Sequence, residues 1–352
     1  MLLLQWMRYA TLGLIDSYCK DNSAKVKYCE GGVVSVVLTN GHSMKAIRFH
    51  EYGGFEMLKY EDVPRPEPQS GEVLIQVRAA SVNPFDLALR EGWLASMIPL
   101  QFPAIAGVDV AGIVTATGEG VTDFSVGQDV YGFMSRYNGA YAEYAVVTGE
   151  TIAPKPQSLD YEQAASVPLA ATAAWQTLFD IGGVKEGQKV LIHGGAGGVG
   201  TFAVQLAKLK GAYVLATTSS ENVEYVQGLG ADEVIDYTIR PFETVAHDVD
   251  LVLDLVGGET QQRSWSVLKA GGILVSLQEP PSQEVAAKYD VRAAFVGAQP
   301  SSGLLKELAD LLDIGQIKTH VDKVFPLEQA RQAQELKRNG HTQGKIVLKI
   351  AD

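Results

Sequence analysis

Apolar positions divide the chain into two parts that differ in their period. Between Met44 and about Gly149, short β-branched runs alternate with segments rich in glycine and proline, such as PRPEPQSGE and GVTDFSVGQDV. Such punctuation is typical of strands joined by turns, and it predicts strands over residues 72–78, 111–116 and 142–147. This part of the chain is therefore expected to form a compact, mostly β domain.

From about Val167 the apolar runs are separated by segments with helical spacing. Val199, Ala203, Leu206 and Leu209 share one helical face, and further helices are predicted over residues 223–229 and 260–268. Repetition of strand, helix and strand indicates a doubly wound α/β domain with a parallel sheet. Its predicted strands cover residues 190–192, 213–217, 233–236, 250–255, 273–277 and 291–296.

The remaining segments set the expected domain boundaries. After about Gln299 the pattern predicts a helix in SGLLKELADLLDIG, a second in LEQARQAQELKRNG and a last strand over residues 345–349. Residues 1–43 differ in pattern from the rest of the chain and are interpreted as an N-terminal extension. We expect one domain from residues 44–166 together with 298–352, and the α/β domain from residues 167–297.

The segment HGGAGGVG, residues 193–200, fits the pattern G-x-G-x-x-G through Gly195, Gly197 and Gly200. A predicted strand precedes it and a predicted helix follows it, which is the setting of a dinucleotide-binding turn. The three glycines would permit the tight turn, the approach of a pyrophosphate to the backbone, and close packing of helix on strand. Thr201 stands where a P-loop requires lysine, which disfavours nucleotide triphosphate hydrolysis. A glycine-rich turn without a ligand is the alternative.

The residues after the second α/β strand favour a cofactor that carries a 2′-phosphate. An NAD-binding turn expects an acidic residue about 20 positions on, where it holds the ribose hydroxyls. Here the segment is ATTSSEN, in which Thr218, Ser219 and Ser220 precede the first acid, Glu221. Hydroxyls can donate to a phosphate and a carboxylate would repel it, so we expect NADPH. The alternative is an ordinary loop rich in serine and threonine.

Composition narrows the class of partner. The formal net charge of −12 argues against nucleic acid or an anionic membrane as the main partner, because both attract basic surfaces. The two cysteines, Cys19 and Cys29, are too few for a disulfide framework, which suits a protein of a reducing compartment. We therefore expect the protein to be cytoplasmic. The apolar start is interrupted by Arg8 and predicts no membrane span. A small-molecule substrate is the remaining expectation.

Eight motifs in order make a family resemblance specific. They are SVNPFDLALREG (81–92), GVDVAGIV (107–114), GAYAEYAVV (139–147), AATAAWQTL (170–178), HGGAGGVG (193–200), LGADEVIDY (229–237), DLVGG (254–258) and HTQGKIVL (341–348). From residue 44 to residue 350 the chain resembles the zinc-independent quinone oxidoreductases, the zeta-crystallin-like group of the medium-chain dehydrogenase/reductase superfamily. The resemblance implies a GroES-like, mostly β catalytic domain, a Rossmann NADP-binding domain and a homodimer.

The same resemblance implies an activity without zinc. Asn83 stands where zinc-dependent relatives have a cysteine ligand, and Val108-Asp109 stands where they have a His-Glu pair. The six histidines lack ligand spacing, so each is interpreted as a surface or loop residue. The implied reaction is NADPH-dependent reduction of quinones and α,β-unsaturated carbonyls, with hydride delivered to the β-carbon and the enolate then protonated.

The site residues follow from the motifs and the resemblance together. Asn83 is the expected catalytic residue, whose amide would bind the substrate oxygen, although an Asn-Pro pair can also be a simple turn. Thr172, Tyr237, Gly257 and Leu277 have alternative interpretations as ordinary helix, strand-end, turn or core residues. The expected cofactor contacts are Thr172, Gly195, Ala196, Gly197, Gly198, Val199, Gly200, Thr218, Ser219, Ser220, Asn222, Tyr237, Val256, Gly257, Leu277 and Lys345, and the expected pocket residues are Arg90, Trp93 and Tyr137.

Departures from the family pattern leave two questions open. Asn222 replaces a lysine often found beside the 2′-phosphate, and residues 341–343 lack the usual arginine, so NADPH preference is expected to be weaker and NADH use is allowed. Ala88 and Leu94 replace two common tyrosines, which removes a phenolic proton donor at those positions. Trp93 and Tyr137 can instead be core aromatics and Arg90 a solvated charge. The missing tyrosines motivate an alternative function, an NADPH-binding structural or regulatory protein with little catalysis.

Overall fold

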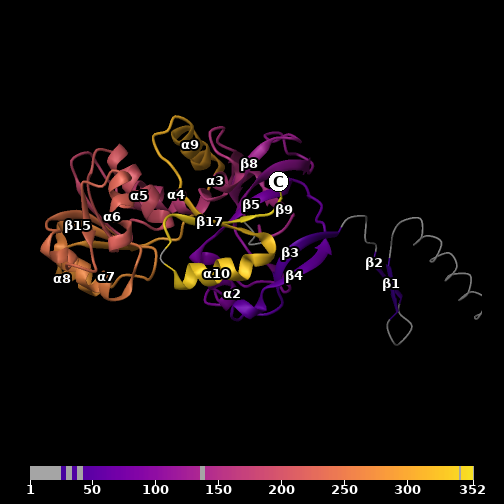
Figure 1. Ribbon diagram of the computed structural model, residues 1–352, viewed down its shortest axis with the longest axis horizontal. Coiled ribbons are helices and arrows are strands. Elements are labelled where there is room, and N and C mark those ends of the chain that lie inside the picture. Colours follow the sequence, from indigo (N-terminus) through magenta and orange to yellow (C-terminus); the bar gives the residue numbers. More distant parts are fainter. Residues whose placement is uncertain (1–24, 29–33, 38–42, 135–138, 341, 352) are drawn as a thin grey trace, which may run out of the picture.

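The molecule has two main sheets, one with mostly antiparallel strand pairs and one whose strands are all parallel. The computed structural model describes residues 25–28, 34–37, 43–134, 139–340 and 342–351. In these ranges no helix has the length and apolarity needed to cross a membrane. Figure 1 shows a lobe containing α5 to α8 at one end, a strand-rich lobe towards the other end, and α10 with β17 between them.

The strand-rich lobe is built on a seven-stranded sheet with the order β10-β8-β7-β5-β18-β17, in which β9 also pairs with β5. Its long strand β5 is buried almost throughout, because β-branched and small residues face layers on both sides. The bounds are β5 Glu72–Val82, β7 Asp109–Thr117, β8 Asp129–Phe133, β9 Tyr144–Thr148, β10 Ile152–Pro154, β17 Val321–Pro326 and β18 Lys345–Lys349. This is the mostly β domain that the sequence predicts.

A small sheet and several short helices complete this lobe, and a two-stranded ribbon lies apart from it (Figure 1). A three-stranded sheet has the order β4-β3-β6, and β1 pairs with β2 in a separate antiparallel ribbon. The strand bounds are β1 Lys25–Tyr28, β2 Val34–Val37, β3 Ser43–Phe49, β4 Lys59–Pro64 and β6 Ala104–Ile105. The helices are η1 Phe55–Met57, α2 Pro84–Glu91, η2 Gly149–Thr151, α3 Tyr161–Ala165, η7 Leu327–Gln329 and α10 Ala330–Asn339.

The second lobe is a doubly wound α/β unit. Its six strands are all parallel and have the order β13-β12-β11-β14-β15-β16, so the first strand in sequence lies at the centre. The Rossmann architecture expected from the sequence is confirmed. The strands are β11 Lys189–His193, β12 Tyr213–Thr218, β13 Glu233–Asp236, β14 Val249–Asp254, β15 Leu268–Ser276 and β16 Arg292–Phe295; the helices are α5 Gly198–Leu209, η4 Ser220–Asn222, α6 Val223–Gly228, η5 Phe242–Thr244, α7 Gly258–Ser264, η6 Trp265–Val267 and α8 Gln283–Lys288.

Helices α4 (Pro168–Trp175) and α9 (Ser302–Asp313) join the two lobes, and η3 (Gln176–Ile181) continues α4. One apolar core includes residues of both sheets together with these helices. The hydroxyl of Tyr131 on β8 donates to the carbonyl of Leu305 on α9 at 2.5 Å, which fixes α9 on the β lobe. The chain thus enters the Rossmann lobe through α4 and returns through α9.

Two features differ from the sequence interpretation. Strand β17 was not expected, because its residues are half-exposed or exposed at the edge of the sheet and carry no alternating apolar pattern. His193 was interpreted as a surface or loop residue, and that was wrong: it ends β11 and is 1% exposed. Its ring contacts Phe242 edge-on, with ring centres 4.6 Å apart.

Candidate active site

The glycine turn between β11 and α5 has no room for a side chain at Gly200 and little room for one at Gly195. A Cβ atom at Gly200 would lie 2.2 Å from the carbonyl oxygen of Gly194, and one at Gly195 would lie 3.0 Å from the Cβ of Ala216. At Gly197, by contrast, only the Gly194 oxygen lies within reach, at 3.4 Å. One side of the turn is therefore open at Gly197, where the helix α5 begins.

The start of α5 can bind an anion. Gly197 is its N-cap and Gly198 its first residue, and the first N–H groups of a helix have no partner within the helix. These groups and the helix dipole together favour a phosphate. The open backbone at Gly197 fits the pyrophosphate of a dinucleotide, and Ala196 and Val199 lie in the same turn.

The ribose end of the turn is built from β12, η4 and the residue after β13. Thr218 ends β12 and is buried, and its carbonyl accepts from the N–H of Tyr237 at 3.1 Å. The side chain of Tyr237 is 51% exposed. Asn222 donates to the Ser219 hydroxyl at 3.0 Å. The structure therefore brings together the hydroxyls and amide that the sequence assigned to this region.

One carboxylate in this region was missed by the sequence reasoning. Asp236, which pairs with Thr218 across the sheet, accepts hydrogen bonds from the hydroxyls of Ser220 and Thr238. These hydrogen bonds, that of Ser220 first, lower the pKa of Asp236 and keep it ionised. The pairing of β12 with β13 could have revealed it, because Asp236 ends its strand beside the end of β12.

A buried carboxylate shapes the turn after β14. Asp254 accepts from the N–H groups of Val256 at 3.0 Å and Gly257 at 2.8 Å. Gly257 has a φ of 79°, a left-handed conformation that favours glycine. Leu277 follows β15 and donates its N–H to the carbonyl of Asp254 at 3.2 Å. Both predicted crevice segments therefore lie together at the carboxyl end of the parallel sheet.

The loop before β18 crosses from the β lobe to the glycine turn. The N–H of Gly344 donates to the carbonyl of Ala196 at 2.8 Å, and the amide of Gln343 donates to Asn222 at 2.8 Å. The Lys345 side chain passes the start of α5, where a Cβ at Gly198 would lie 2.7 Å from its Cδ. This loop connects the cofactor turn with the rest of the site.

Asn83 lies at the other end of the Lys345 side chain. Strand β5 ends directly before Asn83, and its pairing with β7 and β18 brings Asp109 and Lys345 to the same place. The ammonium of Lys345 donates to Asn83 Oδ1 and lies 3.5 Å from Asp109 Oδ2. Asn83 Nδ2 donates to Asp109 Oδ2 at 2.8 Å and lies 3.5 Å from the Ser81 hydroxyl. All three residues are at least 96% buried.

Burial dominates the electrostatics of this group. Desolvation lowers the pKa of Lys345, and attraction to Asp109 opposes that change. Asp109 also accepts from the Ser81 hydroxyl at 2.7 Å and from the N–H of Leu169 at 3.0 Å, so it fixes the start of α4. The lysine and Asp109 form one buried ion pair, and Asn83 bridges it.

An apolar wall borders Asn83, and the sequence reasoning did not identify it. Val108 and Phe133 are buried in one cluster with Leu89, and Phe85, Leu94 and Leu169 pack against them. The rings of Phe85 and Phe133 lie 6.5 Å apart. Phe85 follows Asn83 by two positions, Val108 directly precedes Asp109, and the N–H of Leu169 donates to Asp109. Closeness in sequence to Asn83 and Asp109 was therefore the signal that could have revealed Phe85 and Val108. Such a wall can hold a flat, apolar substrate.

Thr172 carries a buried hydroxyl that has no hydrogen-bond partner among the described residues. It lies in α4, three residues after Leu169, and is fully buried. An unsatisfied buried hydroxyl costs free energy, and a ligand amide or ribose hydroxyl can satisfy it. This observation fits the expected contact with the nicotinamide end of a cofactor.

The three expected pocket residues are not brought together. Arg90 is fully buried, and its guanidinium is occupied by Gly53, Glu91 and Gln334, so it is not available to line a pocket. Trp93 is 66% exposed and lies beside the guanidinium of Arg338 at 5.2 Å. Tyr137 lies outside the described residues. Arg90 instead ties α2 to α10.

The donor set at Asn83 does not fit zinc. Zinc sites use thiolate, imidazole and carboxylate ligands, whereas this site offers an amide, the side chain of Val108 and one carboxylate. That carboxylate, on Asp109, is already engaged by Ser81, Asn83 and Lys345. The ammonium of Lys345 lies beside this carboxylate and supplies the positive charge that a metal ion would otherwise bring.

A Rossmann sheet whose glycine turn faces a polar site on a GroES-like lobe defines a two-lobed, nicotinamide-dependent oxidoreductase. Family models agree: the model described as "Alcohol dehydrogenase GroES-like domain" matches residues 69–157, and that described as "Zinc-binding dehydrogenase" matches residues 229–348. The chain belongs to the medium-chain dehydrogenase/reductase superfamily, and within it to the zinc-independent quinone oxidoreductase family.

Known relatives cover most of the chain. It is 36% identical over 322 residues to the "NADPH-dependent alkenal/one oxidoreductase, chloroplastic" of Arabidopsis thaliana, covering 87% of this chain and 79% of the relative. The "Chloroplast envelope quinone oxidoreductase homolog" of the same plant is 33% identical, covering 88% and 99%. The solved quinone oxidoreductase from Coxiella burnetii superposes with a TM-score of 0.83 at 36% identity, covering 88% of this chain and 100% of that one.

Proposed function

We propose that this enzyme reduces quinones or the C=C bond of α,β-unsaturated carbonyls with NADPH as the hydride donor. The observation that carries the proposal is the connection through Lys345, whose side chain runs from the glycine turn to Asn83. This side chain joins the turn that we propose holds the cofactor to a polar group whose donors do not suit zinc and that borders an apolar wall. Such a site suits an acceptor that is already polarised and needs only orientation and stabilisation of an oxyanion.

Residues at one end of the site bind the cofactor, and residues at the other end bind the substrate oxygen. Bound NADPH would supply the hydride. The glycine turn and the start of α5 hold phosphate, while the Thr172 hydroxyl is available to the nicotinamide end. Lys345 has three N–H donors and two acceptors within the protein, so one donor can face a developing oxyanion. One N–H of the Asn83 amide makes only a long contact, 3.5 Å, with the Ser81 hydroxyl, so this N–H can turn toward the substrate oxygen.

Cofactor choice is a separate part of the proposal. The hydroxyl-rich end of β12, at Thr218 and Ser219, supports NADPH because no carboxylate ends that strand. Asp236 acts in the opposite direction, since it occupies the Ser220 hydroxyl and adds negative charge. We therefore expect NADPH to bind more tightly than NADH, by a modest factor. Calorimetric titration of both cofactors tests this, and equal dissociation constants would contradict it.

The activity is tested by following NADPH absorbance with three acceptors: 9,10-phenanthrenequinone, a short alkenal and a 2-alkenone. We expect turnover with at least one acceptor and a decrease in kcat for Asn83→Ala with little change in NADPH affinity. Tight NADPH binding without turnover would instead favour the alternative function, a structural or regulatory binding protein. One observation favours that alternative: both ends of the Asn83 amide have partners inside the protein.

The expected homodimer can form through the open edge of the Rossmann sheet. Strand β16 ends that sheet and pairs only with β15 among the described strands. Phe295 on β16 is 50% exposed and Tyr289 is 48% exposed, so apolar surface lies beside this unpaired edge. We propose that two copies pair there. Light scattering after size exclusion tests this, and a dimer that persists in Phe295→Asp would refute this interface.

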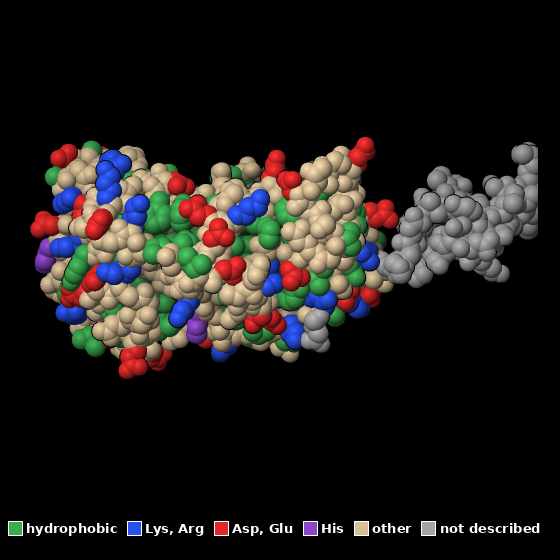
Figure 2. Space-filling view, turned by 90° about the horizontal axis from the view of Figure 1, so that it is seen from above, with side chains coloured by type: hydrophobic (Ala, Val, Ile, Leu, Met, Phe, Trp, Pro, Cys, Tyr) green, Lys and Arg blue, Asp and Glu red, His purple; other side chains and the backbone are tan. Residues whose placement is uncertain are grey.

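The proposal also covers the location and partners of the protein. We propose a cytoplasmic protein that acts on small molecules, and organelle fractionation of the full chain tests the location. Figure 2 shows acidic and basic side chains scattered over one face, with no continuous basic patch of the kind that binds nucleic acid. Enrichment of the full chain in mitochondria or plastids would contradict a cytoplasmic location.

A further inference from the structure

Asp86 is a buried carboxyl group that the proposed hydride transfer does not use. It lies in the first turn of α2 and is 2% exposed. Its Oδ2 accepts from the N–H of Asn83 at 2.8 Å and from the Tyr141 hydroxyl at 3.1 Å. Its Oδ1 has no hydrogen-bond partner among the described residues. One oxygen therefore holds the backbone of Asn83, and the other is unsatisfied.

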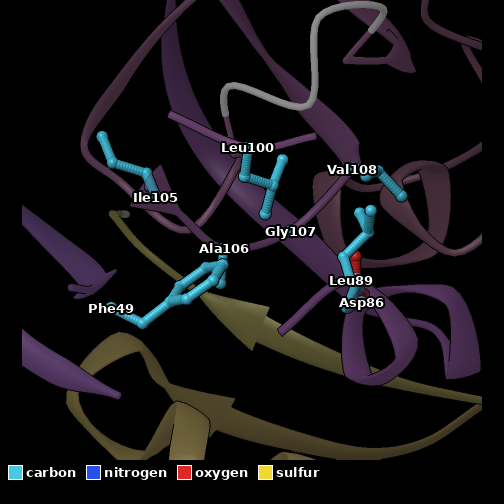
Figure 3. Close-up of a pocket in the computed structure, with 8 residues that line it drawn as sticks. All are labelled: Phe49, Asp86, Leu89, Leu100, Ile105, Ala106, Gly107 and Val108. Carbon is cyan, nitrogen blue, oxygen red and sulfur yellow. The ribbon is translucent and has the colours of Figure 1, made fainter. Parts of the chain in front are cut away.

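The surroundings of Asp86 are apolar on one side. A small cavity with room for about one water molecule lies beside α2 and the segment before β7. Figure 3 shows the Asp86 carboxyl beside Leu89 at the edge of this cavity, with Phe49 and Leu100 further along its wall. Apart from Asp86, the side chains that line it are Phe49, Leu89, Leu100, Ile105, Ala106 and Val108. No side chain here can compensate a negative charge.

The polar side of Asp86 holds one cation for two carboxyls. Asp109 on β7 and Lys345 on β18 face it, and Lys345 is already committed to the ion pair with Asp109. Tyr141, before β9, donates to Asp86, and Gln334 of α10 is neutral. Arg90 on the same helix pairs with Glu91. A charge on Asp86 would therefore be a second anion beside Lys345, the cation that already pairs with Asp109.

We propose that Asp86 is a positioning residue that stays protonated in the active enzyme, holds Asn83 through its backbone N–H, and lowers turnover when it ionises. This rests on the proposed reductase function. A neutral Asp86 leaves Lys345 and Asp109 as a balanced pair, whereas an ionised one gives the group a net negative charge. Negative charge opposes the oxyanion that develops when hydride reaches the substrate. It also attracts the Lys345 ammonium away from the substrate.

The titration range follows from the surroundings. Burial raises the pKa of Asp86 to about 7, with repulsion from Asp109 in the same direction, while the Asn83 N–H, Lys345 and Tyr141 oppose the rise. The change therefore falls near neutral pH. We expect kcat/KM to decrease by about tenfold as pH rises through this range, from the added charge near the reacting atoms.

The pH profile of kcat/KM tests the inference in wild type, Asp86→Asn and Tyr141→Phe. Asparagine keeps an oxygen for the Asn83 N–H but cannot ionise, so the decrease near pH 7 should disappear in Asp86→Asn. Tyr141→Phe removes a donor to the ionised form and should move the decrease to higher pH. Glu119→Gln, an exposed carboxylate, is the matched control and should keep the wild-type profile. A decrease that survives in Asp86→Asn, or that moves to lower pH in Tyr141→Phe, overturns the inference.

Unfolding gives a readout that does not depend on turnover. Because the folded-state pKa of Asp86 is raised from 3.8 to about 7, its contribution to stability is present below 3.8 and is lost as pH rises through 7. The free energy of unfolding of wild type should therefore fall, relative to Asp86→Asn, between about pH 4 and pH 7. Absent turnover with this difference intact means that the proposed function is wrong. Turnover with parallel pH profiles and parallel stability curves means that the role of Asp86 is wrong.

Discussion

His193 should make the Rossmann lobe sensitive to acid. It ends β11 directly before the glycine turn, and its two ring nitrogens lie 3.1 Å from the Thr217 hydroxyl and 2.9 Å from the Ser264 hydroxyl. The Ser264 hydroxyl donates to the carbonyl of Thr260 at 2.6 Å, so it accepts from His193 Nε2–H. Nδ1 is then the acceptor for Thr217. This arrangement requires the neutral ring.

The size of the effect follows from the pKa of His193. Burial, with a smaller contribution from Arg263, lowers it from 6.5 to about 4, while Asp254 and Glu243 oppose the change. The unfolded chain takes up a proton near pH 6.5 and the folded chain does not. His193 therefore contributes stability that is complete above about pH 6.5 and is lost as pH falls towards 4. A difference of about 2.5 pKa units corresponds to about 3 kcal/mol.

The measurement is the free energy of unfolding at about pH 7 and about pH 4.5 for wild type and His193→Gln. Glutamine keeps a donor and an acceptor but cannot ionise, so His193→Gln should lose less stability on acidification, by about 2 to 3 kcal/mol. His247→Gln removes an exposed histidine from the same lobe and serves as the control. Equal losses in wild type and His193→Gln would show that the buried ring titrates as in the unfolded chain and would refute the reasoning.

Three further changes test the cofactor site. Thr172→Val should leave the free energy of unfolding unchanged or raise it by about 1 kcal/mol, because the hydroxyl has no partner among the described residues, while the NADPH dissociation constant rises about fivefold in calorimetry; a stability loss would contradict this. Gly200→Ala should destabilise the protein by about 2 kcal/mol or more in denaturant unfolding and weaken NADPH binding at least tenfold, because its Cβ would meet the Gly194 oxygen at 2.2 Å; tolerated substitution would show that the turn can move. Asp236→Asn should raise the ratio of NADPH to NADH affinity about threefold, because it removes a charge beside Ser220; an unchanged ratio would place the 2′-phosphate elsewhere.

Local sequence signals predicted the Rossmann lobe well because its inner strands β11, β12, β14 and β15 contain buried apolar runs and each is followed by a helix. Residues 233–236 and 345–349 were predicted with the bounds that the structure gives for β13 and β18. Strand β17 was missed because an exposed edge strand buries too little to show an apolar pattern. His193 was misassigned because burial of a polar ring depends on partners 24 and 71 positions away.

The candidate site shows the same division between local and distant information. The glycine turn is contiguous, so its residues were found together from the motif. The group at Asn83 draws on β5, β7 and β18, and its contact with Lys345 spans 262 positions. Sequence alone could place Lys345 in a motif, but only the pairing of β18 with β5 brings its ammonium to the amide of Asn83. The sequence analysis did not single out Asp86 for the same reason, since its partner Tyr141 lies 55 positions away.

The two buried titrating groups give the lobes opposite pH responses. His193, in the Rossmann lobe, favours the folded state less as pH falls from 6.5 to 4, whereas Asp86, in the β lobe, favours it less as pH rises from 3.8 to 7. Each group lies at the edge of the site in its own lobe. His193 directly precedes the glycine turn, and Asp86 accepts from the N–H of Asn83. Acid should therefore loosen the cofactor side first, and a rise towards neutral pH should loosen the catalytic side. Amide hydrogen exchange resolved by residue can separate the two, since β11 and α2 report on different lobes.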